Sequence, residues 1–159
     1  MKYILHLILL SWLTACQTPW LPSKAAERQI IQTLKDETRY FCERNLSKWA
    51  AQWAHVSYAS KMYGGDTDFV VFSGWEAIRQ HTVDHIREHP EPIEVPEVEV
   101  DYHIEYFGKT AWVFYTKKIP QGLAREARFM VQEKGVWKIA RMQTIYLITD
   151  LSHAKGYDN

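Results

Sequence analysis

The sequence predicts an α+β fold, because its first part carries helical patterns and its second part carries strand patterns. Ile30, Leu34, Thr38 and Phe41 recur at the three- and four-residue spacing of an amphipathic helix. Residues 98–106 alternate apolar with acidic or basic side chains, as a strand with one solvated face does. At 159 residues, 47% hydrophobic and 24% charged, the chain has the size and composition of one globular domain.

The first helix is expected to begin after Ser23, which can cap it, and to be interrupted at Asn45. The elements expected next are a short helix with Trp49 and Trp53 on one face, a strand over 55–63, a turn over 64–66 and a strand over 69–72.

The segment Ser73-Gly74-Trp75-Glu76 matches a capping box and predicts a helix that Pro90 and Pro92 end. The second half then predicts strands over 98–106, 111–116, 126–132 and 136–148. The apolar run 111–116 is of the kind that is buried on both faces of a sheet.

The N-terminus predicts export. Met1-Lys2 and an apolar run over 3–13 fit a secretory signal peptide and are too short to span a bilayer. Leu13-Thr14-Ala15-Cys16 resembles the lipobox of bacterial lipoproteins, in which the cysteine is lipidated and the chain is cut before it. An ordinary signal peptide with an incidental cysteine is the alternative. The expected organisation is a signal peptide over 1–15, a lipidated cysteine and tether over 16–23, a domain over 24–150 and a tail over 151–159.

The resemblance to lipoproteins implies export and lipid anchoring to the cell envelope, at the outer membrane or a periplasmic face, and Gln17 after the cysteine favours the outer membrane over the inner one. Only Cys42 remains after Cys16, so no intramolecular disulfide is expected, and Cys42 fits a small buried side chain. Lysine plus arginine balance aspartate plus glutamate at 19 each, without a basic stripe, which argues against a nucleic-acid partner.

The element order resembles that of nuclear transport factor 2-like domains, a superfamily that includes polyketide-cyclase-like proteins and ketosteroid isomerases. The residues that carry the resemblance are Glu37-Thr38, Tyr40, Trp49, Trp53, His55, residues 74–78, Glu126-x-Arg128 and residues 137–139. The resemblance covers about residues 25–149 and implies a cone-shaped, curved antiparallel sheet around the long first helix. It also implies a homodimer formed through the outer face of that sheet.

Two charged residues are the first candidates for a site in the cone. Glu37 lies on or beside the apolar stripe of the first helix, where a carboxylate would suit acid or base catalysis, or it reaches solvent from a shoulder position. Arg128 shares a strand face with Glu126 and Met130 and would hold a carboxylate or another anion. An internal ion pair between Arg128 and Glu37 or Glu126 is the alternative.

Further ligand-binding candidates are aromatic or polar. Tyr40, Trp53, His55 and Tyr58 would form an aromatic wall, with His55 as a second candidate base or as a structural histidine bonded to the backbone. Gln143 is expected on one face of the last strand together with Trp137, Ile139, Arg141 and Ile145. By resemblance, Arg141 and Gln143 stand where kinase association domains carry two histidines, and that pattern is absent here.

His81, His85 and His89 recur every four residues on one helical face, but no cysteine or carboxylate completes a metal set. A solvated polar face is the expectation, with no metal and no cofactor. Three functions stay open. These are a membrane-tethered binder of a small amphipathic or apolar ligand, an isomerase-, dehydratase- or hydrolase-type enzyme in the same pocket, and a structural or interaction module.

Overall fold

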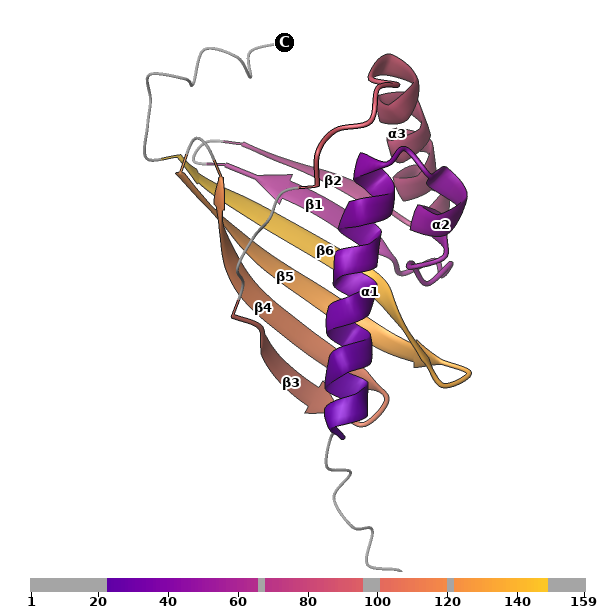
Figure 1. The fold of residues 1–159 in the computed structure, drawn as a ribbon, viewed down its shortest axis with the longest axis vertical. Coiled ribbons are helices and arrows are strands. Elements are labelled where there is room, and N and C mark those ends of the chain that lie inside the picture. Colours follow the sequence, from indigo (N-terminus) through magenta and orange to yellow (C-terminus); the bar gives the residue numbers. More distant parts are fainter. Residues whose placement is uncertain (1–22, 66–67, 96–100, 120–121, 149–159) are drawn as a thin grey trace, which may run out of the picture.

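The computed structural model describes residues 23–65, 68–95, 101–119 and 122–148. The predicted signal peptide, Cys16, the tether up to residue 22 and the predicted tail lie outside these residues. The predicted α+β fold is confirmed, with three helices and a curved six-stranded sheet (Figure 1). Within the described part of the chain, no helix is both long and apolar enough to cross a membrane.

The first two helices begin at residues that cap them. The helix α1 spans Lys24–Cys42, and the Ser23 hydroxyl accepts a hydrogen bond of 3.1 Å from the amide of Ala26. The helix α2 spans Leu46–Ala50, and the Asn45 side chain accepts from the amide of Lys48 at 3.1 Å. Asn45 therefore starts the second helix.

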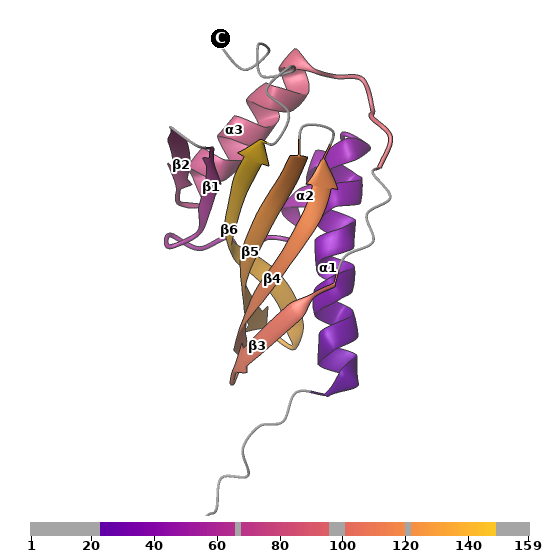
Figure 2. The same cartoon turned by 90° about the vertical axis from the view of Figure 1, so that its left-hand side faces the viewer.

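The sheet contains β1 (Ser60–Gly64), β2 (Phe69–Ser73), β3 (His103–Phe107), β4 (Thr110–Ile119), β5 (Gly122–Glu133) and β6 (Val136–Ile148), in the order β2-β1-β6-β5-β4-β3. The expected sheet was antiparallel throughout, whereas the β1–β6 pair is parallel and the sheet is mixed. We call the face on which α1 lies the inner face and the opposite one the outer face (Figures 1 and 2). Cys42 is buried, as predicted.

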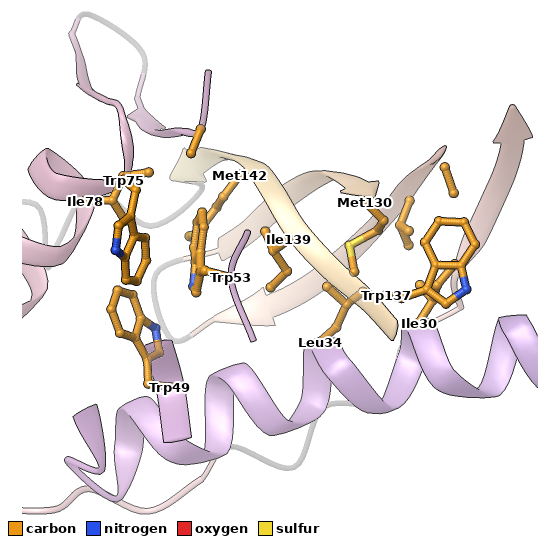
Figure 3. Packing of buried hydrophobic residues seen from close by; sticks show 13 residues of the cluster. Ile30, Leu34, Trp49, Trp53, Trp75, Ile78, Met130, Trp137, Ile139 and Met142 are labelled. Carbon is orange, nitrogen blue, oxygen red and sulfur yellow. The ribbon is translucent and has the colours of Figure 1, made fainter. Parts of the chain in front are cut away.

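Tryptophans fill the core at the end of α1 that leads into α2. Trp49 packs against Trp53 and Trp75, with ring centroids 5.9 and 5.8 Å apart (Figure 3). Toward the other end of α1, Ile30 and Leu34 pack near Trp137 and Met130 of the sheet (Figure 3). The apolar stripe predicted for α1 therefore faces the sheet.

The strand predicted from His55 begins only at Ser60. Trp53 also lies outside α2, because the backbone at 52–54 pairs with Ile139 instead. The Ala54 amide donates to the Ile139 carbonyl at 2.8 Å, and the Ile139 amide donates to the Gln52 carbonyl at 2.9 Å. This pairing between distant parts of the chain overrides the local pattern that predicted a helical face.

The prediction of a capping box at the start of α3 is also wrong. The helix α3 spans Trp75–Glu88, and its N-cap is Gly74, which receives no side-chain hydrogen bond. Gly74 has a φ of 84°, a conformation that glycine adopts without strain, and its amide donates to the Ala59 carbonyl at 2.7 Å. Ser73 is the last residue of β2.

A β-bulge explains a wrong prediction on β6. Phe129 pairs with Arg141 and Met130 pairs with Ile139, so Ala140 is the extra residue on β6. Trp137 and Ile139 consequently face the inner side, whereas Arg141, Gln143 and Ile145 face the outer side. The expectation that β4 is buried on both faces is wrong as well, because Phe114 on its outer face is 39% exposed.

Candidate functional site

Four charged side chains meet on the inner face, and we call them the inner polar cluster: Glu37 of α1, Lys61 of β1, and Glu126 and Arg128 of β5. All four are buried. The strand register brings the three sheet residues together, since Lys61 and Arg128 both pair across Met142 of β6. Glu37 is a buried residue of α1, the helix that lies over this face of the sheet (Figure 1).

Glu126 is the anionic centre of the sheet side of the cluster. Its carboxylate lies 2.5 Å from Arg128 Nη1 and 2.7 Å from Lys117 Nζ, and it accepts a hydrogen bond of 2.8 Å from Thr144 Oγ1. Burial alone would raise the pKa of Glu126, but Arg128 and Lys117 outweigh it and lower that pKa. Glu126 is therefore ionised and ion-paired, as the alternative interpretation of Arg128 predicted.

Arg128 is only 3% exposed, yet its hydrogen bonding is incomplete. Its Nη1 carries the ion pair and two long contacts, 3.5 Å to the Ala127 carbonyl and 3.4 Å to the Gln143 carbonyl. Its buried Nε has no hydrogen-bond partner among the described residues. Burial opposes the charge of Arg128, but Tyr115 and Glu126 hold its pKa above the ordinary value, so the guanidinium stays charged.

Lys61 lies in an aromatic cage. Its ammonium is 5.3 Å from the ring centroid of Tyr63 and 5.7 Å from those of Phe41 and Trp49. The side chain is 3% exposed, and burial lowers its pKa to about 8, although Glu37 counteracts this shift. Lys61 thus remains largely a cation at neutral pH, in surroundings that disfavour the charge.

Glu37 faces inward and is 7% exposed. Its Oε1 accepts a hydrogen bond of 2.8 Å from Trp49 Nε1. The shoulder position considered for Glu37 is therefore not observed. Its role as a ligand contact or a base stays a prediction.

Tyrosine hydroxyls border the cluster. Tyr63 and Tyr115 lie beside Thr144 and Glu126 in the same cross-strand row, and the Tyr102 ring lies 5.0 Å from the Tyr115 ring. Burial raises the pKa of all three phenols, so they stay protonated and available as hydrogen-bond donors.

The structure does not assemble the expected aromatic wall. Trp53 is a core residue, and Tyr58 is exposed. His55 is exposed, with its Nε2 3.0 Å from the Ala50 carbonyl and its ring stacked on Trp75, as the structural interpretation of this histidine predicted. The hydroxyl of the half-buried Tyr40 accepts a hydrogen bond from Arg39.

The side chain of Gln143 lies on the outer face of the sheet, opposite the inner polar cluster. It lines a hollow of about 560 Å³ there, together with Asp101, Phe114–Thr116, Arg125–Ala127 and Ile145. This volume is within the range of small-molecule sites. The predicted Glu37 and His55 do not line it.

The sequence predicted that the α3 histidines form a solvated polar face. That prediction is wrong, because two of the three pack on aromatic rings. His81 stacks on Phe72 at 3.9 Å, and His85 stacks on Phe41 at 5.3 Å. Burial lowers the pKa of both, which favours neutral rings. Within the described ranges, no three histidine, cysteine or carboxylate side chains are grouped to hold a metal.

Sequence reasoning identified Glu37 and Arg128 but missed Lys61 as a member of the cluster. A lysine in a short strand normally projects into solvent. The available signal was its spacing from Tyr63, two residues on, which places both side chains on one face.

The comparisons with known proteins agree with this architecture. A dehydratase candidate of the NTF2-like family from Streptomyces avermitilis has a TM-score of 0.61, with 12% identity over 80% of this chain and 100% of that chain. The chain has the nuclear transport factor 2-like fold. An NTF2-like protein of unknown function from Pseudomonas putida KT2440 gives 0.60, with 15% identity over 79% and 89%. A cystatin-like fold protein from Burkholderia xenovorans LB400 gives 0.56, with 20% identity over 77% and 92%.

These similarities extend to the fold and not to a site. No protein-family model matches the chain, and no curated protein matches it.

Proposed function

We propose that this domain is a binding module for a small amphipathic molecule with an anionic group, which Arg128 and Lys61 hold on the inner face of the sheet. The observation that carries the proposal is the unpartnered Nε of a buried guanidinium. A bound carboxylate or similar anion would accept from it in the planar geometry that arginine favours.

The energetics of the cluster support a functional role. A buried ion pair is often no more stabilising than well-packed apolar side chains, so stability alone does not explain such a cluster. Among the described residues, Lys61, Arg128 and Lys117 lie near two carboxylates, Glu37 and Glu126, which leaves one positive charge in excess. An anionic ligand would neutralise that excess.

Access to the site requires some movement. Lys61 and Arg128 are each 3% exposed, so a ligand that reaches them must displace neighbouring side chains. Tyr63 and Tyr115 are only partly buried, and the Tyr63 ring lies against Lys61 while the Tyr115 ring lies against Arg128. We therefore expect ligand binding to change the environment of these two tyrosines.

The test is native mass spectrometry of the chain from Gln17, followed by thermal-shift titration with a panel of aromatic and aliphatic carboxylates. All described helices and strands lie within this form. We expect a small-molecule adduct or a saturable stabilisation that Arg128→Met abolishes. The matched control is Arg125→Met, three residues away on the outer face, which should keep the response. The proposal is contradicted if the two variants lose the response equally, or if the wild type shows no response at all.

The same panel distinguishes binding from catalysis. If the bound compound is converted over time, the enzymatic alternative holds, and Glu37 beside Lys61 is the group to substitute first. Without conversion, the domain is a binder.

A separate observation supports a second candidate function, self-association. The outer face carries half-buried or exposed aromatic side chains that lie close together: Trp112 is 5.9 Å from Phe114 and 5.1 Å from Phe129 between ring centroids. We propose that a second copy of the chain covers this face. Sedimentation equilibrium should give a dimer for the wild type and a monomer for Phe114→Glu. If the wild type stays monomeric at high micromolar concentration, self-association through this face is excluded.

We also propose that the chain is exported and anchored through a lipid on Cys16. The support is the signal-like segment over 1–15 and the lipobox-like Leu13-Thr14-Ala15-Cys16. Mass spectrometry of the N-terminal peptide from membranes should show a lipidated cysteine at the new N-terminus, and Cys16→Ser should release the protein from the membrane. An unmodified cysteine contradicts the anchor.

A further inference from the structure

We propose that the end of the domain where α1 begins rests on an anionic phospholipid surface, with the two hairpin tips at Phe107 and Val136 in contact with the bilayer. This inference extends the lipid anchor proposed above. It assigns a membrane-facing surface to the folded domain itself.

Three segments that are distant in the sequence form this end. The Gln132 amide donates to the Lys109 carbonyl at 2.8 Å, which joins the β3–β4 turn to the end of β5. The start of β6 lies beside both, since the rings of Tyr106 and Trp137 are 6.2 Å apart. Thr33 Oγ1 contacts the Trp137 carbonyl at 3.3 Å and joins α1 to the same region. The start of α1 and both turns lie at the lower end in Figures 1 and 2.

Each turn presents one apolar side chain to solvent. Phe107 is 59% exposed and Val136 is 44% exposed. They flank tight turns at Gly108 and Gly135, whose φ angles are 63° and 84°. Apolar residues at such tips contribute little to the core and are suited to the interfacial layer of a membrane.

The charge of this end complements an anionic surface. Four basic side chains are exposed here, Lys24, Arg28, Lys109 and Lys134, against the exposed Glu27 and Glu133. The chain as a whole has equal numbers of basic and acidic residues, so this local excess is not a reflection of composition. Basic residues within a Debye length of anionic lipid headgroups are attracted to them.

The anchor would hold this end near the bilayer. Ser23 caps α1, and only residues 17–22 separate it from Cys16. Even a fully extended segment of this length reaches no more than about 25 Å. The start of α1 is therefore the part of the domain closest to the anchor, whereas the β1–β2 hairpin lies toward the opposite end (Figure 1).

The first experiment reads the environment of one hairpin tip in the lipidated protein. Phe107→Cys carries an environment-sensitive fluorophore in a Cys42→Ala background, reconstituted in vesicles of phosphatidylcholine with 30% phosphatidylglycerol. The matched control is Phe69→Cys, 72% exposed on β2. We expect a blue shift and quenching by nitroxide lipids at position 107 and not at position 69. Equal quenching at both positions, or quenching at neither, overturns the proposal.

The second experiment tests the charges without the anchor. The form that begins at Gln17 should sediment with the same vesicles at low salt and lose this binding in 0.5 M salt. Lys109→Glu with Lys134→Glu should weaken partitioning by at least about 25-fold, since each basic residue lost contributes roughly fivefold and the new carboxylates are repelled by the surface. The control pair Lys48→Glu with Lys118→Glu, exposed elsewhere, should stay close to wild type. Equal losses in the two pairs contradict the assigned surface.

The two proposals can fail separately. An unmodified Cys16 peptide removes the anchor, while sedimentation of the unlipidated form still tests the surface. A lipidated Cys16 with no difference between positions 107 and 69 keeps the anchor and overturns the surface.

Discussion

Two arginines on β5 show how differently the two faces of the sheet are used. Arg128 lies on the inner face, buried and paired with Glu126, whereas Arg125 lies exposed on the outer face at the edge of the hollow. Because side chains alternate along a strand, a spacing of three residues places them on opposite faces. A charged side chain loses little hydration on the exposed outer face but much on the buried inner face. We therefore expect that the buried charges of the inner polar cluster are kept for a function.

The largest effect should follow the removal of the buried anion. Glu126→Gln leaves Arg128 and Lys117 without their carboxylate, while an amide retains the shape of the side chain. We expect the free energy of unfolding to fall by about 3–5 kcal/mol, the usual cost of breaking a buried pair. Urea denaturation at pH 7 measures it.

The control on the outer face is Glu105→Gln, which removes the exposed partner of His103. Its effect should lie within about 0.5 kcal/mol, as for most exposed ion pairs. Similar losses for the two variants would mean that the faces do not differ electrostatically.

The next effect is a pH dependence caused by Lys61. Its pKa falls to about 8 in the folded protein, against 10.5 for an unperturbed lysine. Between these values the unfolded chain holds a proton that the folded protein has released, so stability rises with pH in this window. The increase should approach about 3 kcal/mol over the full window.

The measurement is urea denaturation of wild type and Lys61→Met from pH 7 to pH 10. Burial raises the pKa of Tyr63 and Tyr115, which removes stability as pH rises past about 10, but this occurs in both proteins. Glu37, Glu126 and Arg128 also act on Lys61, and they are retained in the variant. The free energy of unfolding of the wild type minus that of Lys61→Met should therefore increase as pH rises. A constant difference would show that Lys61 is not desolvated.

A smaller loss of stability is expected for Trp49, compared with a tryptophan on the outer face. Trp49→Phe keeps the aromatic packing but removes the donor to the buried Glu37 carboxylate. We expect a loss of about 2 kcal/mol, since a hydrogen bond to a charged group is broken and a buried acceptor loses its donor.

The control is Trp112→Phe on β4, which is half-buried on the outer face and should lose less than about 1 kcal/mol. A double-mutant cycle with Glu37→Gln isolates the bond. A coupling energy near zero would show that the Trp49–Glu37 contact contributes nothing to stability.

The sequence predicted the fold where the determinants were local. The periodicity of α1, the alternation of β5 and the exact limits of β6 could be read from nearby residues. The failures depend on contacts between distant residues. Trp53 leaves its helix because Ala54 pairs with Ile139, and Gly74 caps α3 because its amide reaches Ala59.

The site followed the same rule. Helical phase placed Glu37 on or beside the apolar stripe of α1, and strand alternation placed Arg128 on the same face as Glu126 and Met130. Gln143 was assigned to the face of Trp137 because the extra residue at Ala140 leaves no local mark in the sequence. Lys61 was missed because its burial depends on the parallel pairing of β1 with β6. In that pairing Lys61 lies opposite Met142, 81 positions further along the chain.

The last comparison is between two neighbouring residues whose stability losses should not follow the size of the side chain removed. Val113 and Phe114 are neighbours on β4, and the valine is fully buried on the inner face whereas the phenylalanine is 39% exposed on the outer face. Val113→Ala should cost about 2 kcal/mol because it opens a cavity in a packed core. Phe114→Ala removes more atoms but should cost only about 0.5 kcal/mol in the monomer. Thermal unfolding at low micromolar concentration, where self-association does not contribute, compares them. The reverse order would mean that the outer face is part of the core of the folded chain.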